Sequence, residues 1–212
     1  MDPWPPHNLV LRTPRLELRP DDDPGLRELV DEARTGVHPP DYMPFTVPWT
    51  DSQEHEWLQY YWLMRASLKP AEWRLNFLVR LDGRVIGSQG MAADDFAVTR
   101  QASTGSWLGR RYQGMGYGTE MRAAVAMLGF DHLRATRMMS DAFDDNSASL
   151  GVSRKLGYVP DGTHILARRG EPVSLVRLLL TPAAFARPPW QLEVTGLEPC
   201  LPLLVGTPAA TP

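Results

Sequence analysis

The sequence is poor in cysteine and in lysine, and each shortage limits what the protein can be. Cys200 is the single cysteine, which excludes an intrachain disulfide and favours a reducing compartment, so we expect a cytoplasmic protein. Lys69 and Lys155 are the only lysines, so the basic side chains are almost all arginine. No apolar run approaches the ~20 residues of a membrane-spanning helix, and the first residues lack the basic and apolar segments of a signal peptide.

A large excess of charge is also missing. The formal net charge is only −3, which argues against a general nucleic-acid or membrane binder, so neither partner is predicted. With 43% hydrophobic residues in a chain of 212, the protein can bury one good core. We therefore expect a single domain over residues 1–212 with loose tails at residues 1–8 and 207–212, and a homo-oligomer stays open.

Three consecutive aspartates, Asp21 to Asp23, stand directly before Pro24. Acidic residues favour the positive end of a helix and proline favours its first turn, so this segment predicts a helix start. Consecutive residues in such a place rarely converge on one ion. No metal site is therefore predicted.

Apolar runs separated by turn residues predict alternating strands and helices. Asp82-Gly83 between two apolar runs is a strong hairpin signal, and Asn146 and Gly157 are typical of the two ends of a helix. Leu9 to Arg19 is interpreted as a first strand, interrupted at Thr13-Pro14 because proline lacks a ladder donor. The other expected strands are 77–81, 85–91, 102–109, 136–142, 158–167, 173–180 and 190–194, and the expected helices start at 21 and at 50 or 51, cover 117–130 and 147–156, and start again at 181.

A long irregular loop is expected at residues 36–49, rich in proline and yet strongly aromatic. Large apolar groups are costly in open solvent, so such a loop either covers the core or lines a site. Thr50 with Gln53, or Asp51 with Glu54, can begin the next helix as a capping pair.

A glycine-rich loop lies between the strand expected at 102–109 and the helix expected at 117–130. Gly114, Gly116 and Gly118 alternate there, and glycine can take positive φ and bring bare backbone close to a ligand. The first N–H groups of a helix have no partner within it, and the helix dipole places positive charge at the same point. Strand, loop and helix start together predict an anion site, with phosphate as the natural ligand.

Three phosphate-binding patterns compete for this loop. A P-loop needs lysine before its hydroxyl residue, but Gly118 precedes Thr119. A dinucleotide fingerprint needs G-x-G-x-x-G rather than the G-x-G-x-G found here, and a dehydrogenase would also need an acidic ribose partner, for which Asp141 or Asp144 is available. The third pattern, R/Q-x-x-G-x-G/A, fits Arg111 to Gly116 and resembles the pyrophosphate loop of the GNAT acyltransferases.

A second motif extends the resemblance to GNAT enzymes. The segments Asn146-Ser147-Ala148-Ser149 and Arg154-Lys155-Leu156-Gly157-Tyr158 are similar to the N-x-x-S…K-x-G-F/Y segment of the ribosomal-protein acetyltransferase branch. They follow the glycine loop in the order and at the distance typical of that branch. Residues 36–50, 105–109 and 112–125 are also similar to a mycobacterial GNAT N-succinyltransferase.

The resemblance implies a fold and a cofactor. The fold would be α/β, with a mixed, largely antiparallel sheet, helices on both faces, and a splayed pair formed by the strand ending at Gly109 and the strand from Thr136. The acyl donor would be acetyl-CoA or succinyl-CoA, with its pantetheine arm between the splayed strands and hydrogen-bonded by Asn146. Its pyrophosphate would be bound by the loop residues Arg111, Tyr112, Gln113, Gly114, Met115, Gly116, Tyr117, Gly118 and Thr119.

The implied reaction is the attack of an amine on a thioester. The carbonyl oxygen becomes negative and is best met by a preorganised backbone N–H, which by analogy comes from Leu108 or Gly109. By the same analogy, Ser149 assists the departing thiolate. The general base is left open among His38, Asp94, Asp95, Glu120 and His164, or water molecules.

The acyl pocket is expected to include the aromatic loop. A succinyl group carries a carboxylate that must be paired or hydrogen-bonded if it is enclosed, so an arginine or histidine nearby would supply charge. The acceptor would be a primary amine of a small molecule or of a protein, and a non-catalytic acyl-CoA sensor or scaffold of the same fold is the alternative. The residues expected in this pocket are His38, Met43, Phe45, Trp49, Gln89 and Trp107.

Overall fold

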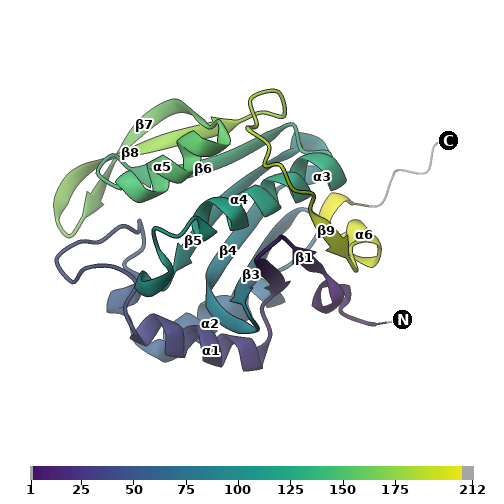
Figure 1. Cartoon of the computed structure of the whole chain (residues 1–212), viewed down its shortest axis with the longest axis horizontal. Coiled ribbons are helices and arrows are strands. Elements are labelled where there is room, and N and C mark those ends of the chain that lie inside the picture. Colours follow the sequence, from purple (N-terminus) through teal and green to yellow (C-terminus); the bar gives the residue numbers. More distant parts are fainter. Residues whose placement is uncertain (1, 207–212) are drawn as a thin grey trace.

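A nine-stranded sheet forms the centre of the protein, and the computed structural model describes residues 2–206 around it (Figure 1). The strands are β1 Val10–Arg12, β2 Leu16–Pro20, β3 Glu72–Leu81, β4 Arg84–Asp94, β5 Gln101–Leu108, β6 Arg137–Phe143, β7 Val159–Arg168, β8 Glu171–Leu180 and β9 Glu193–Thr195. The helices are α1 Asp23–Arg34, α2 Glu54–Ala66, α3 Phe96–Thr99, α4 Tyr117–Met127, α5 Ser147–Leu156 and α6 Leu201–Val205.

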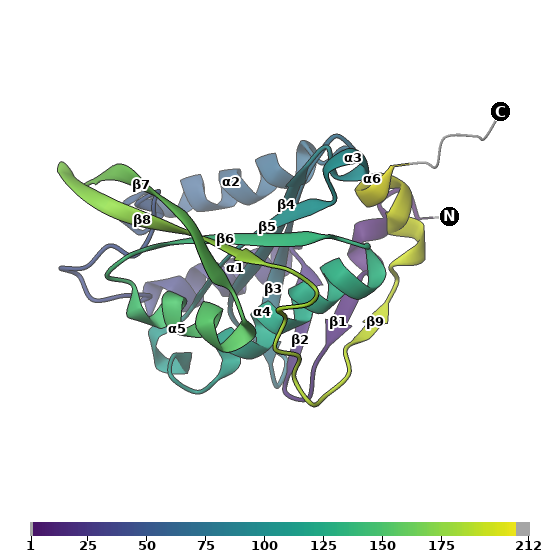
Figure 2. The same cartoon turned by 90° about the horizontal axis from the view of Figure 1, so that it is seen from above.

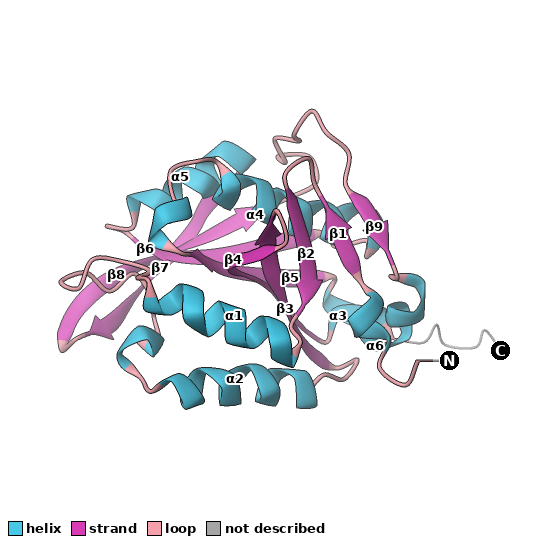
Figure 3. Cartoon of the chain, turned by 60° about the horizontal axis from the view of Figure 1, so that its bottom comes forward, coloured by secondary structure: helices cyan, strands magenta, loops and turns pink. Residues whose placement is uncertain are grey.

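The strands are ordered β7-β8-β6-β5-β4-β3-β2-β1-β9 across the sheet. Every neighbouring pair is antiparallel except β5 and β6, which run parallel because α4 connects them. Helices α1 and α2 lie on one face and α4 and α5 on the other (Figures 2 and 3). The expected mixed, largely antiparallel sheet with helices on both faces is therefore confirmed.

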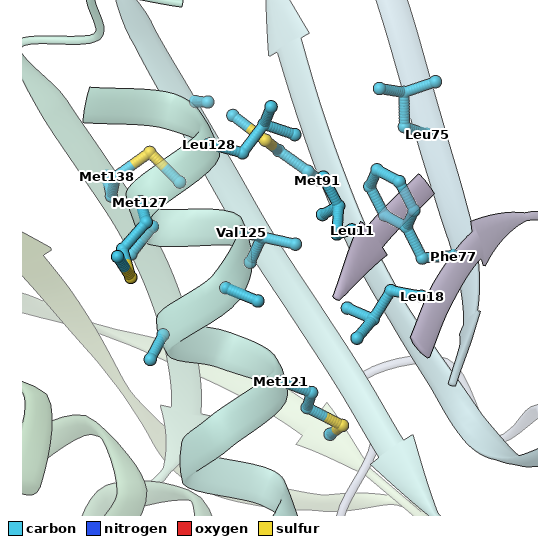
Figure 4. Close-up of a cluster of buried hydrophobic side chains, with 14 of the residues drawn as sticks. Leu11, Leu18, Leu75, Phe77, Met91, Met121, Val125, Met127, Leu128 and Met138 are labelled. Atoms are coloured by element: carbon cyan, nitrogen blue, oxygen red, sulfur yellow. The ribbon is translucent and has the colours of Figure 1, made fainter. Parts of the chain in front are cut away.

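The main core lies between α4 and the sheet. Met121, Val125 and Leu128 recur at helical spacing on the side of α4 that faces Leu18 and Phe77 of the sheet (Figure 4). All five side chains are at most 2% exposed. This packing fixes α4, and with it the glycine loop at its start, against the middle strands of the sheet.

Several local predictions are confirmed. The β3–β4 hairpin turns at Asp82 and Gly83, both with positive φ, as the Asp-Gly signal predicts. The side chain of Asp22 caps α1 by accepting a hydrogen bond of 2.7 Å from the Gly25 N–H. Helix α5 begins after Asn146 and ends at Gly157, whose φ of +91° is the left-handed conformation expected after a helix.

Four other predictions are wrong in detail. Residues 9–19 form two antiparallel strands, because the Thr13-Pro14 segment reverses the chain instead of interrupting one strand. Helix α2 is capped by Gln53, whose N–H donates to the Glu56 carboxylate at 2.8 Å, and neither predicted capping pair is used. Residues from Thr181 form a turn and no helix, and the last strand is shortened to Glu193–Thr195.

Of the two expected loose tails, only the N-terminal one, from residue 2, lies within the described residues. Pro5–Asn8 form a 3-10 turn. Residues 207–212 lie outside the described residues. Within residues 2–206, no helix combines the length and the apolar character that crossing a bilayer requires.

Candidate active site

A gap between β5 and β6 is the central feature of the site. The two strands pair only at Gln101–Arg137, Ala102–Met138 and Ser103–Met139, although β5 continues to Leu108 and β6 to Phe143. Where the pairing ends, Thr104 Oγ1 donates to the Met139 carbonyl and Ser140 Oγ donates to the Thr104 carbonyl, both at 3.3 Å. The expected splayed pair is therefore present, and a cleft of about 1060 Å³ includes this gap.

The backbone of β5 offers N–H groups to this gap. The Gly109 N–H donates to the Ile86 carbonyl of β4 at 2.9 Å, so it is not free to serve as the predicted oxyanion donor. Along a β-strand, the N–H groups of consecutive residues point in opposite directions, and those of alternate residues point in the same direction. From the β4–β5 register, the N–H groups of Leu108 and Ser106 therefore face the gap. Sequence analysis named Leu108 but missed Ser106.

The glycine loop presents a row of free backbone donors. The N–H groups of residues 114–118 have no hydrogen-bond acceptor within the described part of the chain. Gly114 and Gly116 take φ values of +77° and +87°, which turn the chain so that consecutive N–H groups point outward. By contrast, the N–H groups of Tyr112, Gln113 and Thr119 bond to carbonyls inside the loop, so these three backbone donors are not available.

Arginines flank the loop, but two of them are anchored to buried carboxylates. Arg111 pairs with Glu32, which is 3% exposed. Arg15 pairs with Glu120 at 2.6 Å and donates to the Met115 carbonyl at 3.2 Å. Each pair neutralises a carboxylate beside the loop, so neither Glu32 nor Glu120 opposes an anion at the free N–H groups. Arg15 is distant in sequence and was not predicted as part of the site.

Helix α5 contributes polar side chains to the opposite side of the cleft. Asn146 and Ser149 both line it, together with Lys155. The Asn146 Oδ1 accepts from the Ser149 N–H at 3.1 Å, so Asn146 caps α5. Its Nδ2 and the Ser149 hydroxyl have no partner among the described residues and remain available to a ligand.

Aromatic side chains of the loop at residues 36–49 form the other wall. Trp49 packs against Phe45, Trp57 and Trp107 with ring centroids 5.1 to 5.2 Å apart. Phe45, Trp49, Trp107 and His38 line the cleft as expected. Met43 and Gln89 do not line it.

The two exceptions have different causes. Met43 is 3% exposed because it is buried beneath the loop, where its sulfur accepts a weak bond from Thr50. Gln89 lies opposite Ser106 on the α4 side of the sheet, and its amide donates to the Gly90 and Gly105 carbonyls at 2.9 and 3.2 Å. Neither side chain therefore reaches the cleft in this structure, although Gln89 lies opposite Ser106, which does line it.

The same loop crosses the gap and is fixed at both sides. On the β5 side, the Gln113 side chain donates to the carbonyls of Val37 and Leu108 at 2.8 and 2.9 Å. On the other side, Arg168 binds the Asp145 carboxylate at 2.6 and 2.9 Å, and the Tyr42 hydroxyl donates to it at 3.2 Å. We call Tyr42, Asp145 and Arg168 the loop clamp.

The contacts within the clamp shift the pKa values of Asp145 and Tyr42 in opposite directions. The hydrogen bond from Arg168 holds the pKa of Asp145 below its ordinary value. Burial and the Asp145 charge raise the pKa of Tyr42 to about 12, so its hydroxyl stays protonated and donates. Since the folded-state pKa of Asp145 is depressed, the clamp is complete above the ordinary aspartate pKa and is lost as the pH falls through the folded value.

The candidate bases from the sequence are mostly engaged or remote. The Glu120 carboxylate accepts from Thr13 and Arg15, and Asp94 accepts from Arg74 at 3.0 Å. Asp95 and His164 do not line the cleft. His38 lines it, but both ring nitrogens have partners, the Pro39 carbonyl and the Thr50 hydroxyl, at 2.8 Å.

Asp141 on β6 is a better placed carboxylate. It lines the cleft two residues after the pairing with β5 ends, and it has no hydrogen bond or ion pair within residues 2–206. Partial burial raises its pKa, opposed by the positive charge of His164 and Arg177. Sequence analysis considered it only as a ribose partner, because its place beside the gap depends on the sheet register.

Metal binding has no visible basis in the described residues. No group of three or more histidine, cysteine, aspartate or glutamate side chains among them is arranged to hold an ion.

Comparison with known proteins gives one consistent family. The profile of the Acetyltransferase (GNAT) domain family matches residues 9–159. A Vibrio cholerae protein proposed to be a ribosomal-protein-serine acetyltransferase is 24% identical, with a TM-score of 0.66 over 82% of this chain and 97% of that one.

Two structures containing coenzyme A have the same fold. Mycobacterium smegmatis RimJ, solved with CoA-disulfide, is 20% identical, with a TM-score of 0.66 over 88% of this chain and 93% of its own. RimL, a ribosomal L7/L12 α-N-protein acetyltransferase solved with coenzyme A, is 16% identical, with a TM-score of 0.69 over 82% of this chain and 99% of its own.

The clamp predicts a local change in dynamics on substitution. Asp145→Ala removes the acceptor of Arg168 and Tyr42, so the amides of residues 36–51 should exchange with deuterium roughly 5- to 10-fold faster, as expected for loss of a partly exposed ion pair and a hydrogen bond. Hydrogen exchange read by mass spectrometry checks this. Asp144→Ala, one residue away and outside the clamp, is the control; equal exchange in the two variants would contradict the clamp.

Proposed function

The chain belongs to the Acetyltransferase (GNAT) domain family, and we propose on that basis that it transfers an acyl group from a coenzyme A thioester to a primary amine. The observation that carries the proposal is the row of free N–H groups at residues 114–118, directly beside a gap that β5 and β6 leave open. An anion site joined to an open strand edge suits a ligand with a diphosphate and an extended amide-containing arm.

The residues present fit such a ligand. The loop offers donors and no carboxylate, since Glu120 and Glu32 are neutralised by Arg15 and Arg111. The N–H groups of Ser106 and Leu108 would hold the arm and the acyl carbonyl between them, and Asn146 Nδ2 would hold the arm from α5. An acyl-CoA thioester would supply an activated acyl carbon, which would bond to the amine nitrogen as its bond to sulfur breaks.

The roles of this chain follow from where its groups lie. We assign the stabilisation of the developing negative charge on oxygen to a β5 N–H that faces the gap, that of Leu108 as expected from the sequence or that of Ser106, which lies farther from the glycine loop. The Gly109 N–H is excluded by its bond to Ile86. The Ser149 hydroxyl would hydrogen-bond the departing sulfur. Asp141, which lines the cleft from β6, would accept the proton that the attacking amine loses.

The donor and acceptor are proposed by class. Acetyl-CoA or succinyl-CoA is the donor, the latter in line with the similarity of residues 36–50 and 112–125 to a mycobacterial GNAT N-succinyltransferase. The acceptor is a primary amine of a small molecule or of a protein. The descriptions of the Vibrio cholerae protein and of RimL name ribosomal proteins, which makes a protein amine one natural candidate.

A sensor that binds acyl-CoA without turnover is the competing function. The discriminating experiment incubates the protein with acetyl-CoA or succinyl-CoA and a panel of amines and peptides, measures free thiol, and identifies the amide product by mass spectrometry. Thiol release that depends on the amine supports the enzyme. Binding without release supports the sensor, and absence of binding overturns both.

The glycine loop predicts a selective loss of coenzyme A binding. Gly116→Val forces a branched side chain onto a backbone with φ of +87°, with its Cβ 3.3 Å from the Arg15 guanidinium, so the free N–H groups should lose their arrangement. Coenzyme A affinity should fall at least ~10-fold, as for loss of one hydrogen bond to a charged group. Calorimetric titration measures it, and Gly83→Val, at a hairpin glycine with φ of +82° and open space, controls for backbone strain.

We expect the Ser149 hydroxyl to affect kcat and not the affinity for coenzyme A. Ser149→Ala removes a hydroxyl that lines the cleft but leaves the backbone N–H that Asn146 caps, so α5 stays intact. We expect kcat to fall roughly tenfold with little change in coenzyme A affinity, since one hydrogen bond to developing charge is lost. Steady-state kinetics and titration test this, and an unchanged kcat would remove Ser149 from the mechanism.

We expect the Asp141 carboxylate to determine how activity depends on pH at the acidic end. Since burial raises its pKa, the carboxylate becomes protonated at a higher pH than an ordinary aspartate, and activity should decline as the pH falls through that value. In Asp141→Asn this acid limb should disappear and kcat/KM for the amine should fall about 100-fold, the lower range for general base catalysis. Asp144→Asn should keep both, and an unaltered limb in Asp141→Asn would exclude this base.

A further inference from the structure

Arg122 is a buried cation for which the described chain offers no counter-charge. It lies on α4 and is 4% exposed, and it lines the cleft. Its Nη1 donates to the Ser153 hydroxyl at 2.9 Å and its Nη2 to the Ser106 hydroxyl at 3.1 Å. The Nε has no acceptor among residues 2–206, and no carboxylate there lies within ion-pair distance of the guanidinium.

The other poorly exposed arginines are arranged differently. Arg65, Arg80 and Arg168 have side chains 23%, 16% and 17% exposed, and each pairs with a carboxylate. Removing a guanidinium from water without an anion is unfavourable, and the group does not lose its proton in proteins. Burial lowers the pKa of Arg122, as expected for a cation removed from water. The fold therefore holds a permanent positive charge that lacks an anion.

The surroundings of Arg122 are neutral and polar. Tyr158 is 5% exposed and Gln89 is fully buried, and the Tyr158 hydroxyl and Gln89 Oε1 both lack a hydrogen-bond partner within the described residues. Gln89 is the cross-strand neighbour of Ser106, which binds Arg122. Buried polar atoms without partners are uncommon in native proteins and mark places where a further group is expected.

The position of Arg122 shows which part of a ligand it would meet. It stands six residues after Gly116 in the sequence, so with a rise of 1.5 Å per residue it lies roughly 9 Å along α4 from the glycine loop. A diphosphate held by the loop would not reach it. Its partner Ser106 lies on the open edge of β5, and its partner Ser153 donates to the carbonyl of Ser149 at 3.0 Å. With the arm along Ser106 and the sulfur beside Ser149, as proposed above, these contacts place Arg122 toward the acyl end of the cleft.

We propose that Arg122 binds a terminal carboxylate on the acyl group, so that the donor is the coenzyme A thioester of a short dicarboxylic acid, with succinyl-CoA as the probe. This inference rests on the proposed function, because it assumes that the glycine loop holds the diphosphate. Arg122 would be the arginine or histidine that the sequence predicts near the acyl group without identifying the residue. The carboxylate takes no part in the transfer and appears unchanged in the amide product.

The test compares two ligands that differ at one end of the acyl chain. Succinyl-CoA and butyryl-CoA have acyl chains of equal length, with a carboxylate in one and a methyl group in the other. Calorimetric titration should show the wild-type protein binding succinyl-CoA at least ~10-fold more tightly, the lower range for a hydrogen-bonded charge pair. In Arg122→Met the ratio should fall to about one while butyryl-CoA affinity stays within about threefold, and Arg122→Lys should keep an intermediate ratio.

Controls separate this inference from the function itself. Arg74→Met removes another arginine that lines the cleft, one already paired with Asp94, and should leave the ratio unchanged. Equal wild-type affinity for the two ligands, or a ratio that Arg122→Met does not alter, overturns the inference while binding of coenzyme A leaves the proposed function standing. If free coenzyme A does not bind, both fall.

Circular dichroism and thermal unfolding show whether Arg122→Met folds. If it does not, Ser106→Ala takes its place, because it removes the Nη2 acceptor and should lower the ratio at least ~3-fold through a looser guanidinium. A ratio equal to that of the wild type in a folded Ser106→Ala would then overturn the inference.

Discussion

The structure depends on one constraint, that β5 and β6 pair for three residues and then diverge. An open parallel edge leaves backbone donors and acceptors without partners, which a folded chain tolerates only where other groups satisfy them. At the fork, the hydroxyls of Thr104 and Ser140 satisfy two carbonyls. Beyond it, the N–H groups of Ser106 and Leu108 have only the cleft to face, so the divergence that opens the site also supplies it with donors.

Two buried carboxylates, each paired with an arginine, hold the segments around this opening in place. Glu32 reaches from α1 to Arg111, and it lies so close to Gly109 that a Cβ there would overlap its carboxylate. Glu120 ties α4 to Arg15 in the same way. Each of these pairs has a carboxylate and a guanidinium from elements distant in sequence, so they fix the glycine loop without consuming its free N–H groups. Arg122 breaks the pattern, since its partners are hydroxyls.

The parts of the fold that the sequence could predict are local. The Asp82-Gly83 turn, the α5 limits and the glycine loop are each specified by residues within a few positions of one another. The parts it could not predict depend on register or on distant pairs. Gly109 was expected to offer its N–H, but whether an N–H faces β4 or the gap is decided by the pairing with Ile86. Arg122 carries no local signal at all, because an arginine in an apolar helix is indistinguishable from an exposed one until its neighbours are known.

One end of the cleft is lined by backbone N–H groups and the other by side chains, and this difference affects specificity. On the proposed function, the glycine loop recognises its ligand through backbone N–H groups, so many sequences can preserve it and it selects little beyond a diphosphate. The opposite end is built from side chains: the aromatic wall around Trp49, the carboxylate of Asp141 and the guanidinium of Arg122. On the proposed function, discrimination among acyl groups and amines therefore resides in these side chains, and a relative that keeps the loop but changes them would retain the cofactor and change the reaction partners.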